Sequence, residues 1–108
     1  MISMHVVVLS EWDASKNVEI YKKSLELMTR FIEYWEKLSK EKSIHPIYDK
    51  IFTDNSGHYS NWTEYESLAD FQKIWDDETY QKYWSQYSRY VDNCRIRVMR
   101  PTGIGVEI

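Results

Sequence analysis

The chain has 108 residues, of which 29% are charged, and a formal net charge of −3 at pH 7. This length suits one domain over residues 1–108, and the charge balance excludes the strongly basic surface of a nucleic-acid-binding or membrane-surface protein. Mean hydropathy is −0.64, and no apolar run approaches the roughly 18 residues that a membrane span requires. We expect a cytoplasmic location, because residues 1–12 lack the pattern of a signal peptide and Cys94, the single cysteine, cannot form an internal disulfide.

Residues 4–12 are predicted to form the first strand. The β-branched run at 6–8, followed by Leu9, places apolar side chains on both faces of this strand. A strand of this kind lies in the middle of a sheet whose two faces are both covered.

Residues 17–42 show the longest helical periodicity in the chain. Apolar residues recur at spacings of three and four in two neighbouring stripes, so we expect an amphipathic helix with a wide buried face. The first stripe consists of Val18, Tyr21, Leu25, Met28, Ile32 and Trp35. The second stripe consists of Ile20, Leu27, Phe31, Tyr34 and Leu38.

The middle of the chain predicts a hairpin followed by two helices. Strands at 47–53 and 58–65 flank the sequence Asp-Asn-Ser-Gly, whose Asn and Gly supply the positive φ angles of a tight turn. A capping-box pattern at 67–70 begins a short helix. Asp77 is the expected N-cap of the next helix.

The last predicted strand covers residues 94–99, and its side chains alternate between two faces. Cys94, Ile96 and Val98 share one face, and the other carries Arg95, Arg97 and Met99. Residues 101–108 alternate again and are expected to form a short additional arm.

The resulting order βαββααβ predicts an α+β, ferredoxin-like fold. Its four-stranded antiparallel sheet has the first and third strands in the middle, and its helices cover one face. Because the first strand is apolar on both faces, the other face also needs a cover. We expect a second copy of the chain to supply it, which makes the protein a homodimer with sheet facing sheet.

The stretch NWTEYESLADF at 61–71, followed by WDDETY at 75–80, resembles the dimeric α+β barrel superfamily. That group includes the antibiotic-biosynthesis-type monooxygenases, the NIPSNAP-like proteins and the stress-responsive barrel proteins. The resemblance covers residues 4–100 and implies a ligand chamber between the sheet and the helices. It implies no single activity, because the superfamily holds cofactor-free oxygenases, haem-degrading enzymes and lyases.

The resemblance also implies that Asn, Trp, Tyr and Arg side chains bind the substrate in that chamber. The residues of these types that we take as candidates are Asn61, Trp62, Tyr65, Arg95 and Arg97. Asn61 and Trp62 point to opposite faces of their strand, so one of the two at most faces a given chamber. The two arginines share a face and could hold an anionic ligand. As an alternative, they are solvated or partner-pairing charges that protect a sheet edge.

We expect neither a metal nor a cofactor. His5, His45 and His58 do not share the short spacing of metal ligands, and Cys94 has no neighbouring cysteine. The resemblance implies that haem-degrading members bind iron through a histidine in the second helical region, and residues 68–91 contain none. Two tyrosines of that region, Tyr83 and Tyr87, could ligate iron instead. Packing between the helix and the sheet is the more ordinary role for both.

Two classes of function stay open at this stage. The first is a cofactor-independent monooxygenase, or a related protein that binds a small aromatic molecule. The second is a non-catalytic homodimeric structural or stress-related module whose aromatic side chains all belong to the core. A chamber lined by both polar and aromatic groups would favour the first, and a closed core would favour the second.

Overall fold

The computed structural model describes residues 5–102 and 104 and confirms the predicted ferredoxin-like α+β fold. The elements in chain order are β1 (Val6–Ala14), α1 (Val18–Glu41), β2 (Tyr48–Thr53), β3 (His58–Tyr65), α2 (Leu68–Trp75), α3 (Glu78–Ser88) and β4 (Val91–Met99). The additional arm expected at 101–108 falls mostly on residues 103 and 105–108, which lie outside the described residues. Within the described part of the chain, no helix combines the length and the apolar character needed to cross a bilayer.

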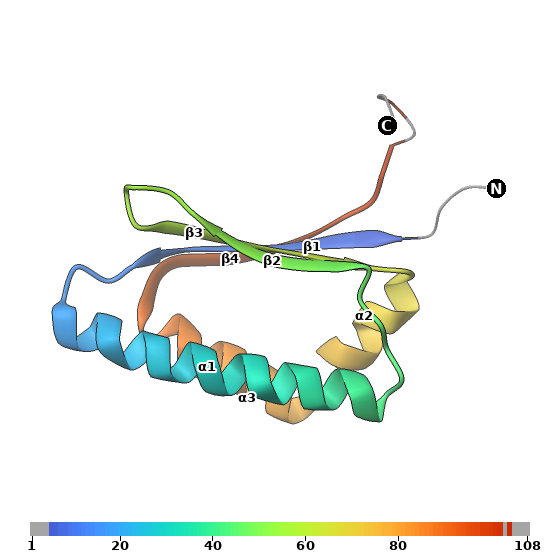
Figure 1. The fold of residues 1–108 in the computed structure, drawn as a ribbon, viewed down its shortest axis with the longest axis horizontal. Helices are drawn as coiled ribbons and strands as arrows, with labels where there is room; N and C mark the ends of the chain where they lie inside the picture. Colours follow the sequence, from blue (N-terminus) through green and yellow to red (C-terminus); the bar gives the residue numbers. More distant parts are fainter. Residues whose placement is uncertain (1–4, 103, 105–108) are drawn as a thin grey trace.

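The four strands form one antiparallel sheet in the order β2-β3-β1-β4. The prediction that the first and third strands lie in the middle is therefore confirmed. Figure 1 shows the sheet as one layer, with α1, α2 and α3 packed against the same side of it. The described helices thus leave the opposite side of the sheet without a helical cover.

The register of β1 fixes which side chains belong to each side of the sheet. Leu9 lies opposite Trp62 on β3 and opposite Arg97 on β4, whereas Ser10 lies opposite Asn61 and Ile96. Because successive side chains of a strand alternate, these two rows point to opposite sides. We call the side of Ser10 the helix face and the side of Leu9 the open face.

Helix α1 begins where its sequence supplies a cap. The side chain of Asn17 accepts a hydrogen bond from the backbone N–H of Ile20 at 3.1 Å, which satisfies one of the free donors of the first turn. The helix ends at Glu41, close to the predicted boundary. Its first turn carries Glu19, and its last turn carries Lys40, in keeping with the helix dipole.

The buried face of α1 differs from the first predicted stripe. Val18 and Leu25 of that stripe are 62% and 41% exposed, whereas Leu27 of the second stripe is buried as predicted, together with two serines. The serines are tolerated there because their hydroxyls donate to backbone carbonyls of the same helix. Ser24 donates over 2.6 Å and Ser39 over 2.8 Å, so neither is left unsatisfied. A search for apolar periodicity counts serine as polar, so it leaves Ser24 and Ser39 out of the predicted buried face of α1.

The core lies between the helix face and the helices and is dominated by rings. Phe31 of α1 lies 5.0–5.5 Å, between ring centroids, from three rings of α3. Trp12 of β1 stacks on Tyr59 of β3 and meets Tyr87 edge-on. Aromatic pairs at such distances add to the stability from area burial, which lets a short chain build a firm core. The buried apolar residues near α2 include Val6, Val8, Leu38, Ile44, Tyr65, Phe71 and Ile74.

The break between α2 and α3 depends on Asp77, as the sequence predicts. Its Oδ2 accepts the backbone N–H of Tyr80 at 2.9 Å, which caps α3. The same oxygen accepts the hydroxyl of Tyr34 at 2.6 Å, so the cap also ties α3 to α1. The hydrogen bond from Tyr34 lowers the pKa of Asp77.

Replacing Asp77 by alanine should lower the stability of the fold. Loss of an N-cap costs about 0.5–2 kcal/mol, and the lost Tyr34 contact places the expected value toward the upper end. Urea denaturation followed by circular dichroism measures this change, with Asp77→Ser retaining part of the cap. The matched control is Asp76→Ala, which removes an exposed neighbouring carboxylate and should change stability by less than about 0.5 kcal/mol. Equal midpoints for wild type and Asp77→Ala would contradict the assigned cap.

Candidate functional site

A chamber lies between the helix face of the sheet and the helices α1 and α3. Its volume is about 70 Å³, and its described lining combines aromatic, aliphatic and polar residues. The aromatic members are Trp12, Phe31, Trp35, Tyr65, Tyr80, Trp84 and Tyr87. An apolar cavity of ~150 Å³ holds benzene, so this chamber accepts a single ring at most, and only if neighbouring side chains shift.

The chamber opens between α1 and the edge strand β2. Most of its lining residues are buried or half-buried, and the exposed members are Ile32 on α1 and Asp49 on β2. Two exposed residues on adjacent elements mark the mouth. A ligand's substituent can therefore stay at the mouth while its ring enters the chamber.

Asp49 brings a carboxyl group to this mouth. Its Oδ1 accepts a hydrogen bond at 2.8 Å from the hydroxyl of Thr63, a buried residue on the neighbouring strand. The residue as a whole is exposed, but burial of its carboxyl raises the pKa of Asp49, and the charge of Glu36 on α1 raises that pKa further. Asn61, two residues before Thr63, also lines the chamber. The lining thus has a carboxyl, an amide and a hydroxyl group, which belong to Asp49, Asn61 and Thr63.

Tyrosine hydroxyls and indole N–H groups supply the remaining polar atoms. Trp35 Nε1 donates to the hydroxyl of Tyr65 at 3.0 Å. Burial raises the pKa of Tyr80 to about 12 and raises that of Tyr65 as well, so both phenols stay neutral and can donate. Trp84 Nε1 is fully buried and makes no hydrogen bond of good geometry among the described residues. It lies near the Tyr80 hydroxyl, and this contact offsets part of the rise in the pKa of Tyr80.

The structure divides the five predicted site residues between the two sides of the sheet. Asn61 and Tyr65 line the chamber. Trp62, Arg95 and Arg97 lie on the open face, because they share the register rows of Leu9 and Glu11. Trp62 and the two arginines thus share one side of the sheet, and they do not join Asn61 and Tyr65 in a single chamber between the sheet and the helices. Asp49 was missed because β2 carries little alternation of its own, and only its register with Thr63 reveals its side.

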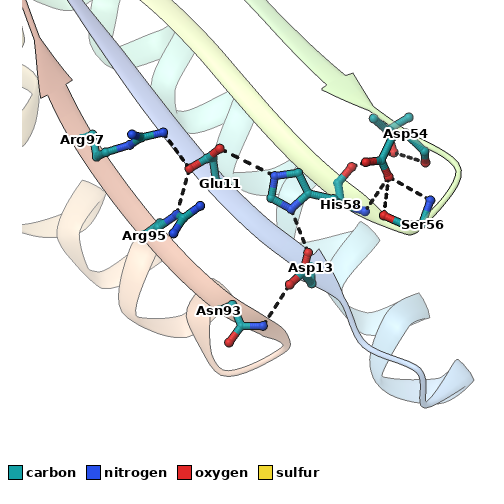
Figure 2. Close-up of polar contacts among 9 residues, drawn as sticks. Glu11, Asp13, Asp54, Ser56, His58, Asn93, Arg95 and Arg97 are labelled. Atoms are coloured by element: carbon teal, nitrogen blue, oxygen red, sulfur yellow. Dashed lines mark hydrogen bonds and ion pairs between the residues drawn. The ribbon is translucent and has the colours of Figure 1, made fainter.

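The arginines are part of a charged cluster on the open face (Figure 2). Glu11 Oε2 accepts hydrogen bonds from Arg95 Nε at 2.8 Å and from Arg97 Nη2 at 3.1 Å. Desolvation works to raise the pKa of Glu11, but the hydrogen bonds and charges of the two arginines outweigh it and lower that pKa. The alternative in which the arginines pair at a sheet edge agrees with this geometry.

His58 continues the cluster toward the hairpin turn. Its Nδ1 lies 2.8 Å from Asp13 Oδ1, and its Nε2 lies 3.7 Å from Glu11 Oε1 (Figure 2). Asn93 donates to the other oxygen of Asp13 at 2.9 Å. The hydrogen bond to Asp13 raises the pKa of His58, while the bonds from Asn93 and His58 lower that of Asp13. We call Glu11, Asp13, His58, Asn93, Arg95 and Arg97 the Glu11 cluster.

Metal chemistry finds no support in the described part of the chain. No group of three or more His, Cys, Asp or Glu residues there could hold a metal ion. Cys94 is half-buried, and burial raises the pKa of its thiol, which makes it a poor nucleophile. Tyr87, one of the two alternative iron ligands, lies in the core against Trp12.

Comparison with known proteins finds solved structures that have a similar fold. The chain matches no protein-family model and no curated protein. A conserved protein from Methanosarcina mazei has a TM-score of 0.69 at 15% identity, with 91% of this chain and 93% of that one covered. SnoaB, a cofactor-independent oxygenase from Streptomyces nogalater, has a TM-score of 0.67 at 7% identity, covering 95% and 98%. An antibiotic biosynthesis monooxygenase has a TM-score of 0.67 at 13% identity, covering 90% and 98%.

These structures confirm the predicted resemblance at the level of the fold. The chain shares its ferredoxin-like α+β fold with SnoaB and with an antibiotic biosynthesis monooxygenase. At identities of 7–15%, the likeness extends to the arrangement of strands and helices and not to an activity.

The Glu11 cluster should make stability depend on the protonation of His58. A raised folded-state pKa means that His58 stabilises the fold fully below its unfolded pKa of about 6.5, and that this contribution is lost as pH rises through the folded value. Asp13 and Glu11 have lowered pKa values, so their contributions are lost only as pH falls through those values. Thermal melts between about pH 5 and pH 9 should therefore show the largest destabilisation by His58→Gln at the acidic end of this range.

The matched control for this measurement is His45→Gln, because His45 is exposed and lies outside the cluster. Its melting temperature should follow that of the wild type at every pH. A His58→Gln difference that stays constant across the pH range would contradict the assigned ion pairs.

Proposed function

We propose that the chain binds a small aromatic molecule in the chamber and supports its cofactor-independent oxygenation. One observation carries the proposal: the space between sheet and helices is lined by seven rings and also by Asp49, Asn61 and Thr63. Rings give an apolar, π-rich wall, and a few polar groups orient a ligand within it. Asn61 and Tyr65, predicted from the sequence as substrate-binding residues, are proposed to act here.

The chemistry that we propose needs no electron donor besides the substrate. A phenol and O₂ give a quinone and water: one oxygen atom joins the ring, the other leaves as water, and the substrate supplies all four electrons. The neutral hydroxyls of Tyr65 and Tyr80 are suited to hydrogen-bond the oxygen atoms of such a substrate. SnoaB, described as a cofactor-independent oxygenase, shares the fold and supports this reaction class by analogy.

We also propose that the protein is a homodimer through the open face. Leu9 and Trp62 are half-buried, apolar and opposite each other in this face. Tyr48 and Phe52 on β2 are 43% and 51% exposed and, with Trp62, line a shallow groove. A second copy burying this surface would remove it from water. We place the protein in a reducing compartment such as the cytoplasm, since it has one cysteine.

The second candidate function is a non-catalytic dimeric module. The small volume of the chamber, about 70 Å³, favours it, because such a space can be a packing defect between large rings. In that case the rings would serve only the core.

Ligand binding should change the tryptophan fluorescence, because Trp12, Trp35 and Trp84 line the chamber. Titration of the wild type with phenol or hydroquinone should give a saturable change. Trp62→Phe should keep this response, since Trp62 lies on the open face, and Trp84→Phe should reduce it. An oxygen electrode then separates the two roles: O₂ uptake with phenol and the appearance of benzoquinone support oxygenation, and saturable binding without uptake leaves a binding protein. A complete lack of response to single-ring ligands would favour the non-catalytic module.

Sedimentation of the wild type at about 10 μM should show a dimer, a concentration at which an interface of ordinary size is occupied. Leu9→Glu places a charge in the middle of the open face and should release monomer. Leu25→Glu is the matched control, because Leu25 is exposed on α1, away from the open face, and its variant should stay dimeric. A wild-type monomer at this concentration would overturn the proposed assembly.

A further inference from the structure

We propose that the chamber selects a hydroxylated aromatic ring that carries a protonated amine, with the amine held by Asp49 at the mouth. This inference rests on the proposed function, namely that the chamber binds a small aromatic molecule, and adds the charge of that molecule. It reverses the expectation of an anionic ligand, which depended on Arg95 and Arg97. Those arginines lie on the opposite side of the sheet, engaged with Glu11.

The charges at the mouth are of one sign. Asp49 is the only charged residue among the described lining residues. The charge that acts on it from α1 is that of Glu36, a second carboxylate. An anion approaching this mouth meets two like charges, and a cation meets two opposite ones. The electrostatics of the entrance therefore discriminate by the sign of the ligand's charge.

One oxygen of Asp49 is held, and the other is available. Thr63 donates its hydroxyl proton to Oδ1 over 2.8 Å, which fixes the carboxylate against the sheet. Oδ2 makes no hydrogen bond within residues 5–102 and 104. An ammonium group that reaches Oδ2 forms a charge-assisted hydrogen bond, which is stronger than a bond between neutral groups. The rings lining the chamber add attraction, since the face of an aromatic ring is negative.

The buried wall of the chamber offers the opposite chemistry. Trp84 Nε1 is buried, makes no hydrogen bond of good geometry within the described residues and lies near the Tyr80 hydroxyl, so a better-placed acceptor would favour this donor. The hydroxyl of Tyr65 accepts from Trp35 and keeps its own proton to donate. A hydroxyl group on the ligand's ring would give these donors an acceptor. The chamber thus presents a carboxylate acceptor on an exposed residue and donors on buried residues, which matches an amine and a ring hydroxyl on one molecule.

Three probes with the same 4-hydroxyphenyl ring test the charge preference on the full chain by isothermal titration calorimetry at neutral pH. They are tyramine, which is a cation, 4-ethylphenol, which is neutral, and 4-hydroxyphenylacetate, which is an anion. We expect tyramine to bind about tenfold or more tightly than 4-ethylphenol, as one charge-assisted hydrogen bond implies, and the anion to bind weakest. In Asp49→Asn, tyramine should lose its advantage over 4-ethylphenol measured on the same variant.

Asp76→Asn is the matched control, because it neutralises an exposed carboxylate that does not line the chamber. It should keep the wild-type order of the three probes. Binding of none of the probes would overturn the proposed function itself. Equal affinities, tightest binding of the anion, or an undiminished tyramine affinity in a folded Asp49→Asn variant would overturn the charge preference and leave aromatic binding standing. Should Asp49→Asn not fold, the order of the three probes on the wild type decides.

Discussion

The alternation of side chains along β1 is the constraint on which the other features depend. Each step along this central strand changes the side of the sheet, so Ser10 belongs to the core and its neighbours Leu9 and Glu11 belong to the open face. Strands β3 and β4 pair with β1 in this register, so the register also determines the sides on which Asn61 and Arg97 lie. A slip by one residue would exchange the two sides completely: the arginines would enter the aromatic chamber, and Asn61 would leave it. Chamber and open face are therefore two results of one alignment.

The Glu11 cluster helps to hold that alignment. Glu11 of β1 contacts Arg95 and Arg97 of β4 on one side and His58 of β3 on the other. These contacts exist in the observed register, and a shift of either neighbouring strand would separate the charges. The two arginines are exposed, so each of their pairs with Glu11 contributes little stability alone. Their shared acceptor, with a side chain 12% exposed, makes the contacts specific for one register. Because Arg95 and Arg97 contact Glu11 on the open face, their positive charges lie on the opposite side of the sheet from the chamber.

Local patterns in the sequence predict the elements of this fold well. Asp77 acts as the cap that its position predicts, and the apolar run in β1 correctly places that strand in the middle of the sheet. On α1, Leu27 and Leu38 of the second predicted stripe are buried, whereas Val18 and Leu25 of the first are exposed. Ser24 and Ser39 were missed because they satisfy their own hydroxyls within the helix and so behave as small core residues. Short-range periodicity does not contain that information.

The candidate site was harder to predict than the fold because it combines elements that are distant in sequence. Asp49 becomes a chamber residue only through its pairing with Thr63. The side of Arg95 and Arg97 depends on pairing with β1, more than 80 residues earlier in the chain. Alternation correctly separated the arginines from Cys94 and Ile96. It could not tell which of the two sets faces the helices, because that assignment requires the register across the sheet.

The hairpin of β2 and β3 has a consequence for the order in which the chamber is assembled. Its turn is self-contained: Asp54 Oδ1 accepts from the backbone N–H and the hydroxyl of Ser56, and Gly57 takes the positive φ of +84° that the reversal requires. Closing so short a loop loses little chain entropy, whereas pairing Glu11 with Arg95 closes a loop of 84 residues. Asp49, Asn61 and Thr63 all lie on this hairpin, so the polar end of the chamber forms from local contacts. The aromatic walls on α1 and α3 come from elements that are distant in sequence from this hairpin, and contacts of such long range are slow to form.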